Sequence, residues 1–167
     1  MIIVCPLSHI ERTVASTGAE RIISLLSEGT ALTRPAVIAE HHHLHLTMHD
    51  IAEPHDGMTL PAEEHVHAIL DFVRGWDRGK PILVHCFAGI SRSTATAYTI
   101  AAALAPKRSE AELARTLRRL SPTATPNPRI VALADAILGR DGRMISAIAA
   151  IGRGADCYEG TPFTLEI

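Results

Sequence analysis

The sequence is poor in aromatic residues and cysteine, and it contains no long hydrophobic run. Aromatic residues make up 4% of the 167 residues, and the formal net charge is −2. A charge this small gives no basic surface for nucleic acid or anionic lipid. No apolar stretch reaches the length of about 18 residues that a membrane span needs, and the N-terminus lacks the pattern of a secretory signal. We therefore expect neither a nucleic-acid partner nor a membrane partner.

The three cysteines, Cys5, Cys86 and Cys157, are too few and too widely spaced for a disulfide framework. A thiol that does chemistry also suits a reducing compartment, so we expect a cytoplasmic protein. The hydrophobic content of 47% and the length of 167 residues fit one globular domain with a buried core. We predict a single domain over residues 1–167, with a core at about 1–140 and a C-terminal helix and tail at 141–167.

Short apolar runs alternate with helical patterns along the first two thirds of the chain. The predicted strands are 2–5, 21–27, 44–48 and 82–85. The predicted helices are 8–18, 61–76, 91–104, 109–120, 126–139 and 142–151. Ser8 with Glu11, and Ser109 with Glu112, fit capping boxes at the starts of the first and the fourth of these helices. The tail after Gly152 has no clear pattern. Strands that alternate with helices favour an α/β fold, with a mostly parallel central sheet of four to five strands flanked by helices.

The most informative run of the chain is His85–Ser93, which reads HCFAGISRS. An apolar strand leads into Cys86, five residues separate this cysteine from Arg92, and a helix-compatible stretch begins at Ser91. Consecutive N–H groups in such a loop form an anion-binding nest, and the helix adds its positive end. Arg92 can donate to two oxygens of a tetrahedral anion, and this field favours the ionised thiol of Cys86. The run predicts a site where sulfur attacks a phosphate.

This run resembles the phosphate-binding loop H-C-x5-R-[S/T] of cysteine-based protein tyrosine phosphatases, and it is most similar to the dual-specificity branch. The resemblance covers roughly residues 1–140 and implies a tyrosine-phosphatase-like fold of the dual-specificity type. It implies a metal-independent hydrolase of phosphate monoesters that uses no cofactor and passes through a phosphocysteine intermediate. The implied substrate is a phosphorylated protein or a small phosphomonoester. Phosphotyrosine is favoured, with phosphoserine and phosphothreonine also open, and phosphate, sulfate or vanadate would bind at the same site.

The resemblance also implies a role for each residue of the loop. Cys86 would be the nucleophile, and Arg92 would hold two phosphoryl oxygens. Ser93 would donate its hydroxyl to the departing sulfur, or would simply satisfy the first turn of the helix. His85 would orient the loop. The backbone amides that would bind the phosphoryl oxygens belong to Phe87, Ala88, Gly89, Ile90, Ser91 and Arg92.

The leaving oxygen needs a proton, and two aspartates compete to supply it. In the resembling family this aspartate follows a strand, some thirty-odd residues before the cysteine. Asp50 lies 36 residues before Cys86, directly after a predicted strand. Asp56 lies 30 residues before it, in a Pro-His-Asp-Gly turn where a structural aspartate is common. We favour Asp50 and keep Asp56 as the alternative acid. The resembling family often has a Pro-Asn pair at a comparable place, but a helix cap explains Asn127 at least as well, so we assign it no chemistry.

Eight of the ten histidines lie between His41 and His67. His41, His43 and His45 would share one face of a strand, but no His-x-x-x-His spacing supports a metal site on a helix. We expect surface or active-site rim histidines and no metal centre.

Two other functions remain open: a sulfur- or arsenate-handling enzyme with a similar cysteine loop, and an inactive phospho-binding module. The absence of lysine between Cys86 and Arg92 favours a singly phosphorylated ester as substrate. The sequence predicts neither the oligomeric state nor the physiological target.

Overall fold

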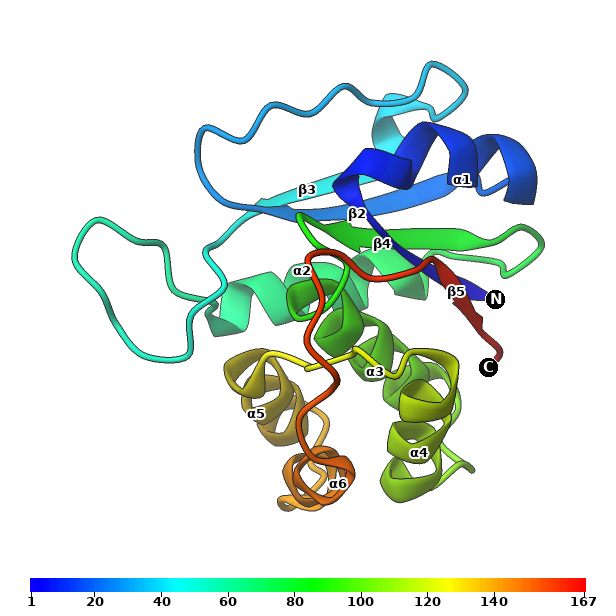
Figure 1. Cartoon of the computed structure of the whole chain (residues 1–167). Coiled ribbons are helices and arrows are strands. Elements are labelled where there is room, and N and C mark those ends of the chain that lie inside the picture. The colour runs from blue at the N-terminus through cyan, green and yellow to red at the C-terminus, as the bar shows by residue number, and fades with distance from the viewer.

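The computed structural model describes all 167 residues and places a mixed five-stranded sheet between two layers of helix (Figure 1). The strand order is β3-β2-β4-β1-β5. The first four strands in sequence are parallel to one another, and β5 is antiparallel to β1. Their bounds are β1 Ile2–Pro6, β2 Arg21–Leu26, β3 His43–Thr47, β4 Ile82–Cys86 and β5 Phe163–Leu165. The predicted α/β class with a mostly parallel sheet is therefore confirmed.

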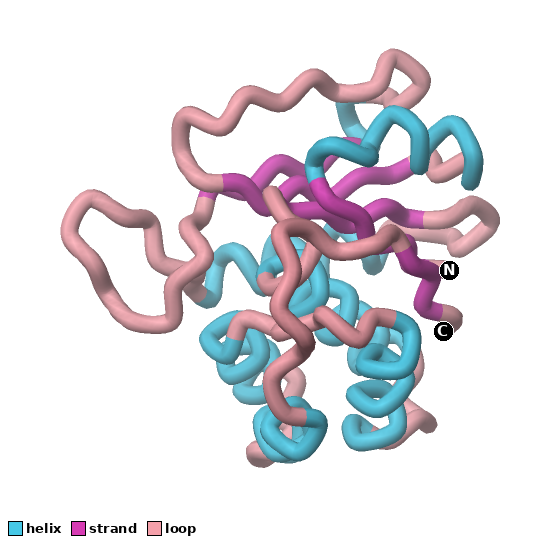
Figure 2. The backbone as a smooth tube through the Cα atoms, in the orientation of Figure 1, coloured by secondary structure: helices cyan, strands magenta, loops and turns pink.

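One helix covers one face of the sheet, and the other five lie on the opposite face (Figures 1 and 2). Because helices cover both faces, β1, β2 and β4 are buried along nearly their whole length, which explains their continuous apolar sequences. The helices are α1 Ile10–Thr17, α2 Glu63–Arg74, α3 Arg92–Leu104, α4 Glu110–Leu120, α5 Pro128–Ile137 and α6 Arg143–Ile151. None of them combines the length and the hydropathy that a membrane span requires.

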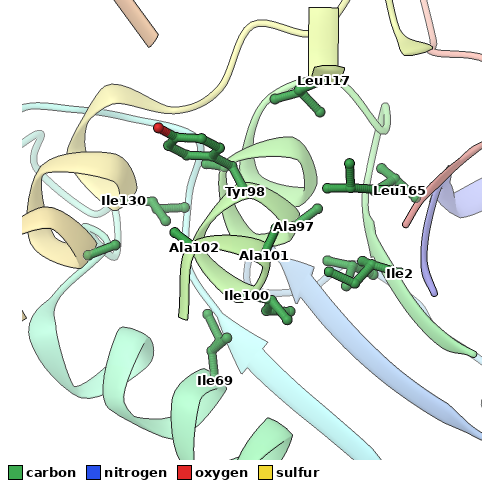
Figure 3. Close-up of a cluster of buried hydrophobic side chains, with 14 of the residues drawn as sticks. Ile2, Ile69, Ala97, Tyr98, Ile100, Ala101, Ala102, Leu117, Ile130 and Leu165 are labelled. Carbon is green, nitrogen blue, oxygen red and sulfur yellow. The ribbon is translucent and has the colours of Figure 1, made fainter. Parts of the chain in front are cut away.

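The helix α3 runs through the centre of the larger core, and its residues from Arg92 to Ala102 are all buried. Small alanine and threonine side chains on this helix allow the sheet and the helices around it to approach closely. Figure 3 shows the alanines Ala97, Ala101 and Ala102 within this core. The one large polar side chain in its middle, Tyr98, donates its hydroxyl to the Glu110 carbonyl oxygen at 3.1 Å. A helix that is buried on all sides has a fixed N-terminus, and the run from His85 to Ser93 ends there.

Two helix boundaries show how well the capping signals predicted structure. Ser109 accepts a hydrogen bond from the Glu112 amide at 3.2 Å, so the predicted cap of α4 is confirmed. The predicted capping box at Ser8 is wrong. A 3-10 turn at Leu7–His9 comes first and α1 begins at Ile10, while the Ser8 hydroxyl donates to the Glu159 carboxylate.

The C-terminal tail, for which the sequence predicts no element, forms the edge strand β5 beside β1. Three residues are too short for a recognisable strand pattern, and the strand exists because β1 offers an unpaired edge. On its way to the sheet the tail contacts the loop between β4 and α3, where the Gly160 amide donates to the Ala88 carbonyl oxygen at 2.8 Å. The tail therefore supports the site as well as the sheet.

Candidate active site

The loop between β4 and α3 lies at the carboxyl edge of the parallel strands, where ligands bind in open α/β sheets. Gly89 allows the loop to turn tightly against β1. Its φ is +71°, and a Cβ there would lie 2.7 Å from the Pro6 nitrogen and 2.9 Å from the Cys5 carbonyl carbon. A larger residue would push the loop away from the strand, so the glycine of the motif is required by packing as well as by conformation.

The carbonyl groups of this loop are bound from outside by other segments, which leaves its amides free. None of the amides at positions 87, 88, 90 and 91 donates a hydrogen bond within the protein, whereas the four carbonyls of the same residues all accept one. Unpaired backbone donors gathered in one loop are costly unless an anion or water binds them. The outside donors are the amides of Leu7 to Phe87, Gly160 to Ala88, Thr125 to Ile90 and Asn127 to Ser91, at 3.0, 2.8, 3.0 and 3.3 Å.

The thiol of Cys86 is 2% exposed and lies among donors. Its Sγ is 3.2 Å from the Ser93 hydroxyl oxygen. The Gly89 amide donates to the same sulfur at 3.3 Å. Both contacts suit a sulfur that carries negative charge, since each group can direct a hydrogen toward it.

Arg92 lies at the N-terminus of α3 and is only 5% exposed. Its Nη1 donates to the Met48 carbonyl oxygen at 2.7 Å and to the Ser27 hydroxyl at 3.3 Å. Its Nε is buried and has no hydrogen-bond partner. A buried guanidinium nitrogen with an unused proton is unfavourable in the absence of an acceptor, and a bound anion supplies one.

A chain of hydrogen bonds runs from the backbone carbonyl of Cys86 through His85 to the neighbouring strands of the sheet. The His85 Nδ1 lies 3.2 Å from the Cys86 carbonyl oxygen, and its Nε2 lies 2.6 Å from the Ser24 hydroxyl. The same hydroxyl lies 2.8 Å from Nε2 of His43. Burial lowers the pKa of His85 to about 4, so its ring is neutral near pH 7.

These contacts fix the protons of the chain. Because a carbonyl oxygen only accepts, Nδ1 of His85 must carry the proton, and its Nε2 must accept one from Ser24. The Ser24 oxygen is then free to accept from Nε2 of His43. Nothing in the sequence indicated these contacts of Ser24 and His43, because the two residues come from β2 and β3 and meet His85 only in the folded sheet.

The structure brings Asp50 against the loop between β4 and α3. Its Oδ1 accepts hydrogen bonds from the Ser91 hydroxyl at 2.7 Å and from the Asn127 side-chain amide at 2.8 Å. Its Oδ2 makes no hydrogen bond within the protein, so this oxygen is available to a bound molecule. Asp56 is exposed in the loop that follows and makes no hydrogen bond or ion pair.

Asn127 does more than the predicted helix capping. Its Oδ1 caps α5 by accepting from the amides of Arg129 and Ile130, both at 3.1 Å. Its side-chain nitrogen donates to Asp50 and to the Ile51 carbonyl oxygen, the latter at 3.3 Å. The residue is 2% exposed, which is unusual for an asparagine that only caps a helix. The burial of Asn127 could not be predicted from the sequence.

The histidines do not gather into one cluster. His43 and His45 stack with ring centroids 5.9 Å apart, but His41 belongs to a 3-10 turn before the strand, so the three do not share a strand face as expected. No group of three or more histidine, cysteine, aspartate or glutamate side chains is placed to hold a metal ion. The His49 and His65 rings accept hydrogen bonds from backbone amides instead.

Solved structures with this fold include several phosphatases, although no family model and no curated protein matches the sequence. The structure of DUSP15 aligns over 90% of this chain and 89% of its own, with a TM-score of 0.66 and 18% identity. The human tyrosine phosphatase-like serine/threonine/tyrosine-interacting protein aligns over 84% and 92%, with a TM-score of 0.66 and 17% identity. PTPMT1 in complex with PI(5)P aligns over 90% and 92%, with a TM-score of 0.61 and 15% identity.

These identities are low, so what the chain shares with these proteins is the arrangement of its sheet and helices. That arrangement agrees with the resemblance found in the run from His85 to Ser93. The chain has the fold of the dual-specificity type of cysteine-based phosphatases.

Proposed function

We propose that this protein hydrolyses phosphate monoesters through a covalent phosphocysteine on Cys86. The observation that carries the proposal is the set of unused donors around this sulfur. Four loop amides and the buried Nε of Arg92 have no partner in the protein, and Cys86 lies on the same loop. Such a set matches the oxygens of a tetrahedral dianion, and it matches the charge that spreads over them in the transition state.

The first chemical step forms a phosphorus–sulfur bond and breaks the ester bond in line with it. The Cys86 thiolate attacks phosphorus, while Arg92 and the loop amides hold the three oxygens that do not react. Asp50 is the general acid, and the proton on its Oδ2 passes to the leaving oxygen. Because Arg92 and the amides neutralise the phosphoryl charge, the step needs no metal ion.

The second step returns the enzyme to its starting state. Asp50, now ionised, takes a proton from water as the water attacks phosphorus, and the phosphorus–sulfur bond breaks. Ser93 lies 3.2 Å from the sulfur and can donate a hydrogen bond to the departing thiolate. This contact supports the role that the motif implies for Ser93, over the alternative of a residue that only satisfies the first helical turn.

We propose protein phosphotyrosine as the favoured substrate, with phosphoserine and phosphothreonine as further substrates. The loop interior carries no lysine that could bind a second phosphate, which favours a singly phosphorylated group. Phe87 is 53% exposed beside Cys86 and can pack against an aromatic ring. A reaction that depends on a free thiolate also favours a reducing compartment, so we propose that the protein acts in the cytoplasm.

The two alternative functions find less support. A sulfur- or arsenate-handling enzyme needs either an external reductant or a second reactive thiol in the chain. Burial raises the pKa of Cys5 to about 12, which disfavours its thiolate, and Cys157 is exposed on the tail. A phospho-binding module would not need a carboxylate with a free oxygen at the rim of the loop, yet Ser91 and Asn127 hold Asp50 there.

Turnover of an aryl phosphate by the wild type and by Cys86→Ser tests the proposal. We expect vanadate-sensitive hydrolysis by the wild type and none by the variant, with phosphate binding retained in both. Tight binding without turnover by the wild type would instead identify a phospho-binding module. Turnover of arsenate only in the presence of a thiol reductant would identify the other alternative.

A further inference from the structure

The loop between β3 and α2 carries Asp50 at its start and projects from the body of the molecule (Figures 1 and 2). Residues 53–58 are all exposed. A general acid must stay within hydrogen-bond reach of the leaving oxygen, so the end of the loop that carries Asp50 has to be held in place.

Three consecutive residues enter the loop, and each has a different partner. The Met48 carbonyl oxygen accepts from Arg92 at 2.7 Å, and Asp50 accepts from Ser91 at 2.7 Å. Between them, His49 closes the loop on itself through two hydrogen bonds to Thr59. Its amide donates to the Thr59 carbonyl oxygen at 2.8 Å, and its ring Nδ1 accepts from the Thr59 amide at 2.9 Å.

We infer that His49 is a positioning residue for Asp50. Its ring acts as a hydrogen-bond acceptor that holds the returning chain against the base of the loop. The inference rests on the proposed function, because it gives His49 a role only if Asp50 donates a proton. Without the ring, one backbone hydrogen bond would close nine intervening residues, and the carboxylate would be held only by Ser91 and Asn127.

The geometry assigns the tautomer of His49. An amide nitrogen only donates, so Nδ1 must present its lone pair and the ring proton must be on Nε2. Asparagine places Oδ1 at the same distance along its side chain as Nδ1 of histidine, so His49→Asn keeps an acceptor at this point. His49→Leu removes the acceptor while keeping a side chain of comparable bulk.

His65 offers a matched control. Its Nδ1 accepts from the Ala62 amide at 3.0 Å, so it makes the same kind of bond to a backbone amide. This bond, however, closes the first turn of α2 and does not reach back to the base of the loop. His65→Leu should therefore lower the melting temperature without affecting proton donation.

The test compares phenyl phosphate, whose leaving group needs a proton, with 4-nitrophenyl phosphate, whose leaving group departs unaided. We expect His49→Leu to lower kcat on phenyl phosphate by about 10- to 100-fold, the size usual for a displaced catalytic group, and to change kcat on 4-nitrophenyl phosphate much less. His49→Asn should stay near the wild type on both substrates, and His65→Leu should leave the ratio of the two rates unchanged. Equal losses on both substrates, or equal losses in His49→Leu and His49→Asn, would overturn the inference.

Measuring Asp50→Asn in the same series separates the role of His49 from the proposed function. If Asp50→Asn shows the leaving-group dependence and His49→Leu does not, only the role of His49 is wrong. If Asp50→Asn shows no such dependence, the assignment of Asp50 as the acid fails, and the role of His49 fails with it.

Hydrogen exchange in the wild type tests the contact directly. The Thr59 amide should be protected, and the exposed Gly57 amide should be unprotected. Rapid exchange at Thr59 would contradict the inference even if the variants do not fold.

Discussion

The proposed phosphate-binding loop, between β4 and α3, and the loop that carries Asp50 meet at one edge of the sheet, but they are held in different ways. The carbonyls of the phosphate-binding loop accept hydrogen bonds from four separate parts of the chain, and the side chains of Cys86 and Arg92 are buried. The Asp50 loop is tied at its base, through His49 and Asp50, while its tip is exposed. One loop is fixed along its length and the other only where it begins and ends.

The difference follows from what each loop has to do in the proposed reaction. Donors that stabilise a developing charge are effective only if they are already in place, because any reorganisation would cost part of the stabilisation. A proton donor needs only one atom in the right position, so the rest of its loop can stay open to a protein substrate. The comparison predicts that changes in the rigid loop affect every substrate, whereas changes at the acid loop depend on the leaving group.

Asp50→Asn should give the largest effect, a loss of roughly 10²–10⁴-fold in kcat on a substrate with a poor leaving group. Asparagine keeps an oxygen that can accept from Ser91 and Asn127, so the loop should stay in place and only the proton is lost. Steady-state rates on phenyl phosphate and 4-nitrophenyl phosphate measure the effect, which should shrink on the second substrate. Asp56→Asn is the control, and leaving-group dependence in that variant instead would reverse the assignment.

How far the sequence predicted these two loops depends on whether the contacts are local. The phosphate-binding loop is contiguous, so a single run of nine residues located it, and the structure agrees with its strand–loop–helix context. The setting of Asp50 depends on Ser91, 41 residues away, and on Asn127, 77 residues away. Spacing could rank Asp50 above Asp56, but nothing in the sequence identified the two residues that hold it.

The same reason explains the other misses. The strand β5 depends on the free edge of β1, and the burial of Asn127 depends on packing between α5 and the Asp50 loop. Alternation and capping signals predicted the remaining elements well, because they report local burial and local hydrogen bonding. Ser8 is the exception, since its hydroxyl binds the distant Glu159 instead of the nearby helix.

Arg92→Lys should lower kcat/KM by about 10²–10³-fold, as expected for the loss of one transition-state donor. Lysine keeps the charge but not the planar fork, so it cannot bind two oxygens while also reaching the Met48 carbonyl. In contrast to Asp50→Asn, the loss should be the same for good and poor leaving groups. A loss confined to phenyl phosphate would mean that the two loops are coupled more tightly than their contacts suggest.

Acid should destabilise the fold through His85, beneath the rigid loop. Burial lowers the pKa of His85 from 6.5 to about 4, so the unfolded chain binds a proton in a range where the folded protein does not. The contribution of His85 to the free energy of unfolding is therefore complete above pH 6.5 and is lost as the pH falls toward 4. The loss from this residue is about 3 kcal/mol at most. The lowered pKa of His43 acts in the same direction.

Urea unfolding between pH 7.5 and pH 4.5 measures this loss. His85→Gln cannot titrate, so its free energy of unfolding should depend less on pH, even if the variant is less stable at pH 7.5. The same pH dependence in the variant and in the wild type would show that other groups cause the acid destabilisation.

Ser24→Ala should give the smallest effect of the series. It tests whether the rigidity of the loop between β4 and α3 depends on the hydrogen bonds that join Ser24, His43 and His85 across the sheet. Without the hydroxyl, Nε2 of the buried His85 has no donor, which costs about 1–3 kcal/mol of stability. The ring is then less strongly held with its proton on Nδ1, so the bond to the Cys86 carbonyl weakens and kcat should fall by about tenfold on both aryl phosphates, the equivalent of about 1.4 kcal/mol. Ser24→Thr keeps the hydroxyl and should retain most of the activity. Ser24→Ala could instead lose stability while its kcat on both substrates equals that of the wild type. In that case the hydrogen bonds through His85 support only the sheet, and the loop is held rigid by the hydrogen bonds that its carbonyls accept from other segments.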